Sequence, residues 1–208
     1  VAGTHGKTTT STLAAWLNSA AAGEGSAFLG GISTNFASNL VLGEGRRLVV
    51  EADEYDRSFL RLWPDVAVIT ATDADHLDIY GTAEAMVEAF EQFASQIKEG
   101  GSLILKQGVA FHFDTKGRNL YRYSCDAGGD FHAENIRLIE GGHYRYDIVL
   151  PDGRIEDCEL GILGKVHIEN SVAAVAMLWC AAKREGKALD REAVRRALRD
   201  FAGVKRRM

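Results

Sequence analysis

The start of the chain carries residues that could bind phosphate groups. Residues 3–9 read Gly-Thr-His-Gly-Lys-Thr-Thr, and apolar residues at helical spacing follow them. Glycines let backbone N–H groups surround phosphate oxygens, the ammonium of Lys7 neutralises their charge, and the hydroxyl of Thr8 can ligate Mg²⁺. The predicted phosphate-binding residues are Gly3, Thr4, His5, Gly6, Lys7, Thr8 and Thr9.

This phosphate loop is a variant of the usual pattern. The full pattern has a glycine about six residues before the lysine, where this chain has Val1. The chain also opens at Val1 without the strand that normally precedes such a loop, so we expect it to be part of a longer protein. A glycine-rich turn with a solvated lysine is the alternative, but the amphipathic helical pattern that follows favours a phosphate loop.

A cluster of carboxylates follows the next apolar run. Residues 51–56 read Glu-Ala-Asp-Glu-Tyr-Asp, directly after the apolar residues 48–50. A solvated acidic loop is the alternative interpretation. However, ligands of doubly wound sheets bind beyond the carboxyl ends of the strands, where the phosphate loop must also lie. A carboxylate such as Glu51 can there hold the Mg²⁺ that bridges nucleotide phosphates.

A third polar cluster follows a second buried strand. Residues 73–78 read Asp-Ala-Asp-His-Leu-Asp, after the apolar run 66–69. A lone histidine is more often structural, but His76 lies among three aspartates at a strand end. It is therefore a candidate for a second metal ion or for a phosphate contact. The three clusters are predicted to meet at one edge of a sheet.

The elements that would position these clusters indicate an α/β protein. Up to about residue 100, short β-branched runs alternate with helical periodicity, which is typical of a mostly parallel, P-loop NTPase-like sheet flanked by helices. Residues 102–160 predict a further strand and a small antiparallel subsheet, with a hairpin turn at residues 151–154. Helices are expected again at about 168–185 and 190–200, the last capped by Asp190.

The overall composition excludes several classes of function. The net charge of the 208 residues is -5, which disfavours a nucleic-acid surface, and no apolar run is long enough to cross a membrane. The three cysteines, Cys125, Cys158 and Cys180, form neither a disulfide framework nor a metal motif. We therefore expect a cytoplasmic protein that binds neither nucleic acid nor membrane.

Taken together, the motifs at residues 3–10, 51–59 and 73–81 resemble the Mur ligases. The resemblance implies that residues 1–202 are the central ATP-binding domain of such an enzyme. It further implies that residues 203–208 begin the linker to a C-terminal domain that the chain does not include.

The resemblance also implies roles for individual residues. Lys7 would contact the β- and γ-phosphates of ATP, Thr8 and Glu51 would hold a first Mg²⁺, and His76 would serve a second. Lys7, Glu51 and His76 are thus the implied catalytic set.

Further nucleotide contacts are implied near the end of the chain. Asn170 resembles the family asparagine that touches adenine, and one or both of Arg206 and Arg207 resemble a family arginine near the phosphates. His167 stands where the family has an asparagine, so the adenine contact at that position stays open.

The implied reaction is the joining of UDP-N-acetylmuramic acid to L-alanine through an acyl phosphate, with both substrates held mainly by N- and C-terminal domains outside the chain. We therefore expect the isolated chain to bind Mg·ATP only weakly and not to form the amide bond. The alternatives are a Mur ligase branch that reattaches a murein tripeptide to the same UDP-sugar, and a P-loop switch module without ligase chemistry.

Overall fold

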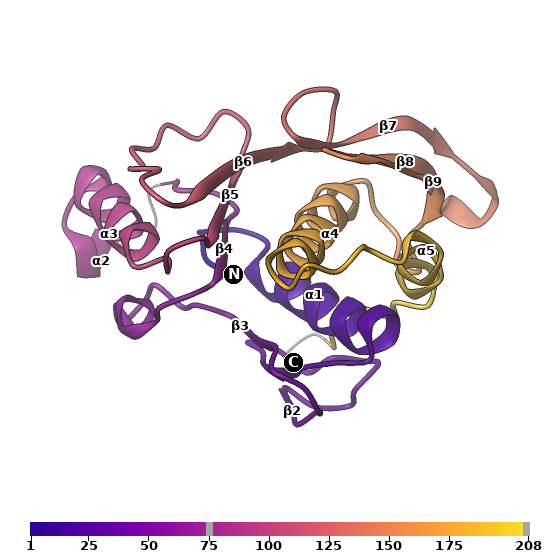
Figure 1. The fold of residues 1–208 in the computed structure, drawn as a ribbon, viewed down its shortest axis with the longest axis horizontal. Helices are drawn as coiled ribbons and strands as arrows, with labels where there is room; N and C mark the ends of the chain where they lie inside the picture. The colour runs from indigo at the N-terminus through magenta and orange to yellow at the C-terminus, as the bar shows by residue number, and fades with distance from the viewer. Residues whose placement is uncertain (74–76, 206–208) are drawn as a thin grey trace.

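The computed structural model describes residues 1–73 and 77–205, which form two sheets with helices between and beside them (Figure 1). The smaller sheet has the strand order β2-β1-β3. Its strands are β1 (Ser26–Phe28), β2 (Leu40–Val41) and β3 (Leu48–Val50), and β1 pairs parallel with β3 and antiparallel with β2.

The larger sheet has six strands in sequence order, from β4 to β9. Strands β4 to β7 pair in parallel, and β8 and β9 continue the sheet by antiparallel pairing. The strands are β4 (Val66–Ile69), β5 (Ser102–Lys106), β6 (Asn119–Ser124), β7 (Phe131–Leu138), β8 (Tyr144–Leu150) and β9 (Gly153–Glu159).

Val1 and Ala2 connect the two sheets. The nitrogen of Val1 donates to the carbonyl of Val50 at 2.8 Å, and the carbonyl of Val1 accepts from Ala52 at 2.8 Å. On the other side, Ala2 forms a parallel bridge with Ile69 of β4. These two residues therefore lie where the strand before a phosphate loop belongs, between β3 and β4.

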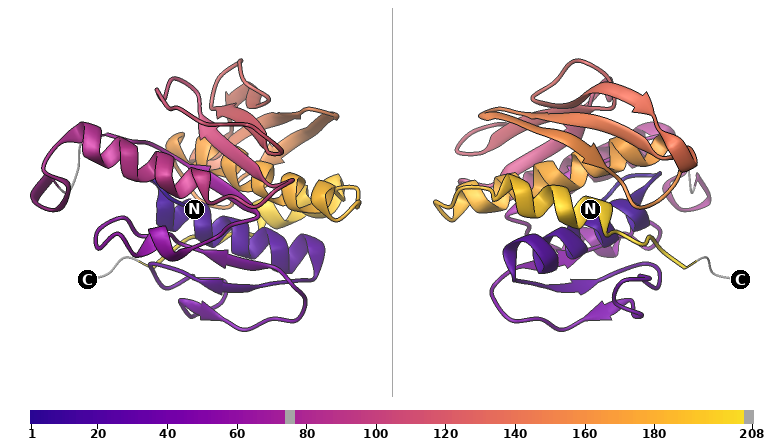
Figure 2. Two further views of the ribbon diagram at one scale, coloured as in Figure 1. Left: turned by 60° about the vertical axis from the view of Figure 1, so that its left-hand side comes forward. Right: turned by 90° about the vertical axis from the view of Figure 1, so that its right-hand side faces the viewer.

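Helices cover both faces of the larger sheet. Helices α1 (Lys7–Ala22), α4 (Val166–Arg184) and α5 (Arg191–Arg199) lie between the two sheets, whereas α3 (Ala83–Ser95) lies on the opposite face of β4 and β5 (Figure 1, Figure 2). The short helix α2 (Leu77–Tyr80) and the 3-10 helices η1 (Ser58–Arg61) and η2 (Glu140–Gly142) lie in the connections.

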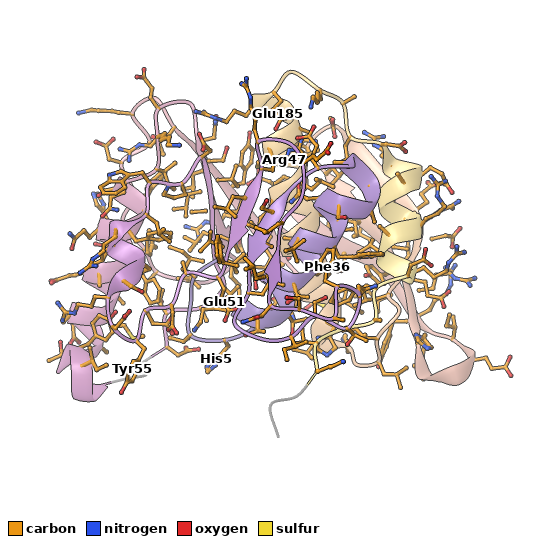
Figure 3. The ribbon with its side chains drawn as sticks, turned by 90° about the horizontal axis from the view of Figure 1, so that it is seen from below. His5, Phe36, Arg47, Glu51, Tyr55 and Glu185 are labelled. Carbon is orange, nitrogen blue, oxygen red and sulfur yellow. The ribbon has the colours of Figure 1, made fainter. Side chains whose placement is uncertain are left out.

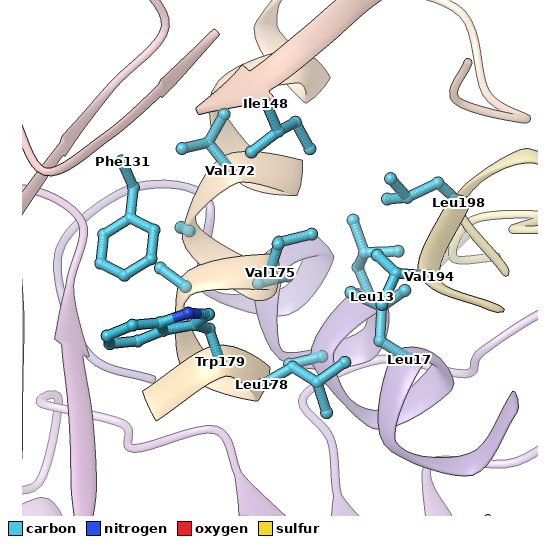
Figure 4. Packing of buried hydrophobic residues seen from close by; sticks show 14 of the residues in the cluster. Leu13, Leu17, Phe131, Ile148, Val172, Val175, Leu178, Trp179, Val194 and Leu198 are labelled. Atoms are coloured by element: carbon cyan, nitrogen blue, oxygen red, sulfur yellow. The ribbon is translucent and has the colours of Figure 1, made fainter. Parts of the chain in front are cut away.

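The main hydrophobic core lies between the larger sheet and the helices α1, α4 and α5 (Figure 4). Helix α4 is buried on several sides because it packs against both the sheet and α1, and its small side chains suit this close contact. A second core joins α3 to the other face of the sheet through Phe59, Phe90 and Phe93.

The structure confirms the predicted α/β class, the helix after the phosphate loop, the two helices near the end of the chain and the hairpin between β8 and β9. The predicted antiparallel strands are β7 to β9, and they continue the main sheet because β7 pairs in parallel with β6. The antiparallel pair of β1 and β2 was not predicted, since β2 has only two residues. Within the described residues, every helix is too short or too polar to span a membrane.

Candidate nucleotide-binding site

The phosphate loop lies at the carboxyl end of β4 and leads directly into α1. Gly3 and Gly6 have φ angles of 117° and 77°, a region that favours glycine. The backbone N–H of Thr4 donates to the carbonyl of Ala71 at 3.1 Å, and the Thr70 hydroxyl donates to the carbonyl of His5. Residues 3–6 are therefore fixed against β4, with the N-terminus of α1 open towards a ligand.

Thr8 and Glu51, the two residues expected to share a metal ion, are in direct contact. The Thr8 hydroxyl donates to Glu51 Oε1 at 2.8 Å, and Glu51 Oε2 accepts from the N–H of Gly30 at 2.7 Å and the hydroxyl of Ser11 at 3.1 Å. A side chain at Gly30 would collide with the Glu51 carboxylate. Strand β1, strand β3 and helix α1 thus hold one carboxylate in a fixed position.

Lys7 ends in an ion pair with Glu54. The distance from Lys7 Nζ to Glu54 Oε1 is 2.6 Å, and the side chain of Glu54 is fully buried. The expected catalytic lysine therefore contacts the acidic cluster as well as lying in the phosphate loop.

The third polar cluster reaches the phosphate loop through its first aspartate. Asp73 Oδ2 lies 3.4 Å from His5 Nε2, and both side chains are exposed. His76 lies outside the described residues, so its predicted metal role stays a prediction. Tyr80, after this cluster, donates from its hydroxyl to the carbonyl of Glu54 at 2.6 Å, and burial raises its pKa.

The first turns of α4 bring Asn170 beside the phosphate loop. The Thr10 hydroxyl donates to Asn170 Oδ1 at 3.3 Å, and the Asn170 amide lies 3.3 Å from His167 Nδ1. A Cβ atom at Gly6 would lie 2.9 Å from Asn170 Oδ1. Burial lowers the pKa of His167, so its neutral form is favoured near neutral pH.

An open cavity of about 590 Å³ connects the phosphate loop to the segment at residues 203–205. Val204 bridges Ser33 in antiparallel fashion, and the N–H of Lys205 donates to the carbonyl of Ile32 at 2.8 Å. Arg206 and Arg207 lie outside the described residues. The cavity is lined by Lys7, Thr8, Gly30, Gly31, Glu51, Asp53, Tyr55, Val204 and Lys205.

The site residues lie at one end of the molecule (Figure 3). Glu51, His5 and Tyr55 are together there, and Arg47 and Glu185 lie at the opposite end. A second cavity, of about 650 Å³, is lined by β3, by the start of β4 and by Arg47 and Glu185, and residues 3–9 of the phosphate loop do not line it.

The donor set suits a hard cation that binds together with phosphates. Within residues 1–73 and 77–205, three or more His, Cys, Asp or Glu side chains do not gather around a common metal position. Mg²⁺ needs only one or two protein oxygens, because phosphates and water complete its octahedral shell. The Thr8 hydroxyl and the Glu51 carboxylate supply oxygens of this kind at the mouth of the phosphate loop.

Sequence reasoning missed three residues that shape the site: Glu54, Gly30 and Thr70. Glu54 belongs to the acidic cluster, but neither its spacing nor its type distinguishes it from Asp53 or Asp56. Gly30 stands in the pair Gly30-Gly31, a signal of close backbone approach that could have been used. Thr70 follows β4 directly, as polar residues at a carboxyl end do.

Residues 1–178 match the Mur ligase middle domain family. The chain belongs to this family. This Mur ligase domain is 48% identical over 209 aligned residues to UDP-N-acetylmuramate–L-alanine ligase of Phocaeicola vulgatus, and 47% identical to that of Parabacteroides distasonis. In each case the match covers the whole chain but 44% of the relative, so the domain spans less than half the length of these relatives.

Solved structures of Mur ligases share the fold of this Mur ligase domain. One is the UDP-N-acetylmuramate:L-alanyl-γ-D-glutamyl-meso-diaminopimelate ligase from Neisseria meningitides. The match covers 99% of this chain and 66% of the Neisseria chain, with a TM-score of 0.79 and 23% identity. Another is the UDP-N-acetylmuramate–alanine ligase of Thermotoga maritima. The match covers 99% of this chain and 45% of the Thermotoga chain, with a TM-score of 0.79 and 24% identity.

Proposed function

We propose that this chain is the ATP-binding part of a ligase that joins L-alanine to UDP-N-acetylmuramic acid. The observation that carries the proposal is the convergence of Lys7, Thr8 and Glu51 on one cavity at the phosphate loop. The substrates are inferred from the relatives, because those that match the whole chain at 47–48% identity bear the name of the alanine-adding enzyme.

In the proposed reaction, a carboxylate oxygen of the UDP-sugar attacks the γ-phosphorus of ATP, and the bond to ADP breaks. The amine of L-alanine then attacks the carbonyl carbon of the acyl phosphate, the phosphate leaves, and the amine loses a proton. Phosphoryl transfer of this kind requires positioning and charge neutralisation more than acid–base chemistry.

The residues of this chain would supply that positioning. The ammonium of Lys7 and the loop N–H groups would neutralise the phosphates, while Thr8 and Glu51 would hold Mg²⁺. A Mg²⁺ ion held there would supply positive charge to neutralise the transferred phosphate. Asn170 would lie beside the adenine, and we keep His76 as the proposed contact of a second metal ion.

We place the binding of the UDP-sugar and of L-alanine mainly outside this chain, since the relatives are more than twice as long as the region matched. We also place the reaction in the cytoplasm. The three cysteines are free thiols, two of them buried, which suits a reducing compartment.

The test is phosphate release by the full-length enzyme with Mg·ATP and UDP-N-acetylmuramic acid. Release that depends on L-alanine is expected, and Lys7→Ala should lower it at least about a hundredfold because a charge at the phosphates is lost. Lys98→Ala, which removes a surface lysine paired with Asp65, is the matched control and should keep the activity.

A dependence on the murein tripeptide instead of L-alanine would assign the chain to the recycling reaction. The Neisseria enzyme and the Thermotoga alanine ligase match the fold with the same TM-score of 0.79, so the acceptor, and not the fold, decides between the two reactions. Release that needs neither acceptor would contradict both ligase assignments and indicate a nucleotide switch.

A further inference from the structure

Two carboxylates of the same loop contact different partners. Glu51 accepts from the hydroxyls of Thr8 and Ser11, whereas Glu54 contacts the ammonium of Lys7 at 2.6 Å. The Lys7 side chain is 15% exposed and that of Glu54 is not exposed at all. The ammonium of the phosphate-binding lysine is thus held from the protein side by a buried anion.

The backbone of Glu54 is held in place by hydrogen bonds on the side away from Lys7. Its backbone carbonyl accepts from the Tyr80 hydroxyl at 2.6 Å and from the N–H of Arg57 at 3.1 Å. Arg57 adopts a left-handed φ of 57°, and its guanidinium carbon lies 4.9 Å from the centre of the Tyr80 ring. The turn at residues 54–57 therefore holds the Glu54 backbone, and with it the base of the carboxylate, in one place.

A buried ion pair of this kind adds little net stability, because desolvating two charges offsets most of their attraction. The ion pair matters more for the position of the Lys7 ammonium than for the stability of the fold. A free lysine side chain samples many rotamers, and restraining it before the reaction lowers the entropy that the transition state must lose. An ammonium has three N–H donors, so a bond to Glu54 leaves others for phosphate oxygens.

We propose that Glu54 is a positioning residue that holds the ammonium of Lys7 at the mouth of the phosphate loop, so that Lys7 bridges Glu54 and the transferred phosphate. The inference rests on the proposed function, since it assumes that Lys7 contacts the phosphates of ATP. Glu54 touches neither the nucleotide nor the reacting atoms in this arrangement; it acts through Lys7.

The kinetic test compares Glu54→Ala with the wild type in the full-length enzyme. The kcat should fall at least tenfold, while the KM for ATP should change less than twofold, because the charge of Lys7 remains but its position is lost. Glu54→Gln keeps an acceptor for the ammonium and should give an intermediate kcat. If the alanine variant does not fold, the glutamine variant carries the test alone.

A second measurement does not depend on turnover. Acylation of lysines by an amine-directed reagent, followed by peptide mass spectrometry, should modify Lys7 several-fold faster in Glu54→Ala than in the wild type. Asp56→Asn, which removes an exposed charge from the same loop and keeps an acceptor for Ser58, is the control and should leave both the kcat and the acylation rate unchanged.

An unchanged kcat in Glu54→Ala would overturn the proposal, as would a rise in the KM for ATP at constant kcat. A many-fold higher Mg²⁺ requirement with unchanged acylation of Lys7 would also overturn it and assign Glu54 to a metal. The measurements hold for whichever acceptor the wild-type enzyme uses. Failure of the proposed function appears separately, as wild-type phosphate release that no acceptor stimulates.

Discussion

Gly3 shows how closely the phosphate loop approaches β4. Its φ is 117°, and a Cβ atom there would lie 2.7 Å from the backbone nitrogen of Thr70 and 2.8 Å from that of Ala71. We expect Gly3→Ala to lower the free energy of unfolding by about 2 kcal/mol, from backbone strain and a collision with backbone that cannot move aside. Urea denaturation measures this loss, and ATP binding should weaken with it.

Gly186→Ala separates the two contributions. Gly186 has a φ of 68°, but nothing lies within 4 Å of the position of its Cβ atom. Only the conformational cost of about 1 kcal/mol is therefore expected there, with unchanged ATP binding. Equal losses of stability in the two variants would mean that contact with β4 does not restrict Gly3.

At the residue scale, the chemistry was more predictable than the geometry. Spacing after an apolar strand predicted that Lys7, Thr8 and Glu51 would meet, because carboxyl ends of parallel strands share an edge. It could not distinguish Glu54 from Asp53. That choice depends on the turn at residues 54–57, in which Glu54 is buried and Asp53 exposed, and on Tyr80 from a later element.

At the scale of elements, α5 is a helix whose sequence already specifies its start. The Asp190 side chain accepts from the N–H of Ala193 at 2.9 Å, as predicted for an N-cap. The helix packs on α1, where Trp16 Nε1 donates to the carbonyl of Ala197 at 2.8 Å. The position of α5 thus affects the helix that begins at the phosphate loop.

Removal of this cap should destabilise the domain. Asp190→Ala leaves the N–H of Ala193 without its side-chain acceptor, and we expect the free energy of unfolding to fall by about 1 kcal/mol. Asp190→Asn keeps an acceptor, so the free energy of unfolding should fall by only about 0.3 kcal/mol. Thermal and urea unfolding of both variants measure the difference, and an alanine variant as stable as the wild type would contradict the role of the cap.

Helices and hairpins were predictable because their signals are local. The periodicity of α1 and α3 and the turn between β8 and β9 lie within short windows of sequence. The strand order is not local. Whether β7 joins β6, or β2 pairs with β1, depends on which distant strands find partners, and pattern alone does not encode this.

At the scale of the whole molecule, a charged cluster ties together elements at the end opposite the nucleotide site. The Arg47 guanidinium donates two hydrogen bonds to the Glu185 carboxylate, each 2.8 Å long, and one to Asn18 Oδ1 at 3.0 Å. Lys187 lies 2.9 Å from both Glu24 and Glu185. The cluster connects the residue before β3 to the C-terminal ends of α1 and α4.

This cluster should make the stability of the domain sensitive to acid. Its hydrogen bonds to Arg47 and Lys187 lower the pKa of Glu185 from 4.5 to about 2. A lowered carboxylate pKa stabilises the fold above the unfolded value, so this contribution is complete above pH 4.5 and is lost as the pH falls from 4.5 towards 2. Solvent screens the partly exposed carboxylate, so the contribution is about 1 kcal/mol.

Glu185→Gln tests this linkage directly. At neutral pH the variant should be less stable than the wild type by about 1 kcal/mol. The difference should shrink as the pH falls from 4.5 towards 2, because Glu185 is then protonated in the unfolded state before it is protonated in the folded one. Urea unfolding at a series of pH values measures both curves, with Glu156→Gln on the exposed side of β9 as the control. A difference that stays constant down to pH 2 would show that packing of the side chain, rather than its ionisation, connects β3 to the ends of α1 and α4.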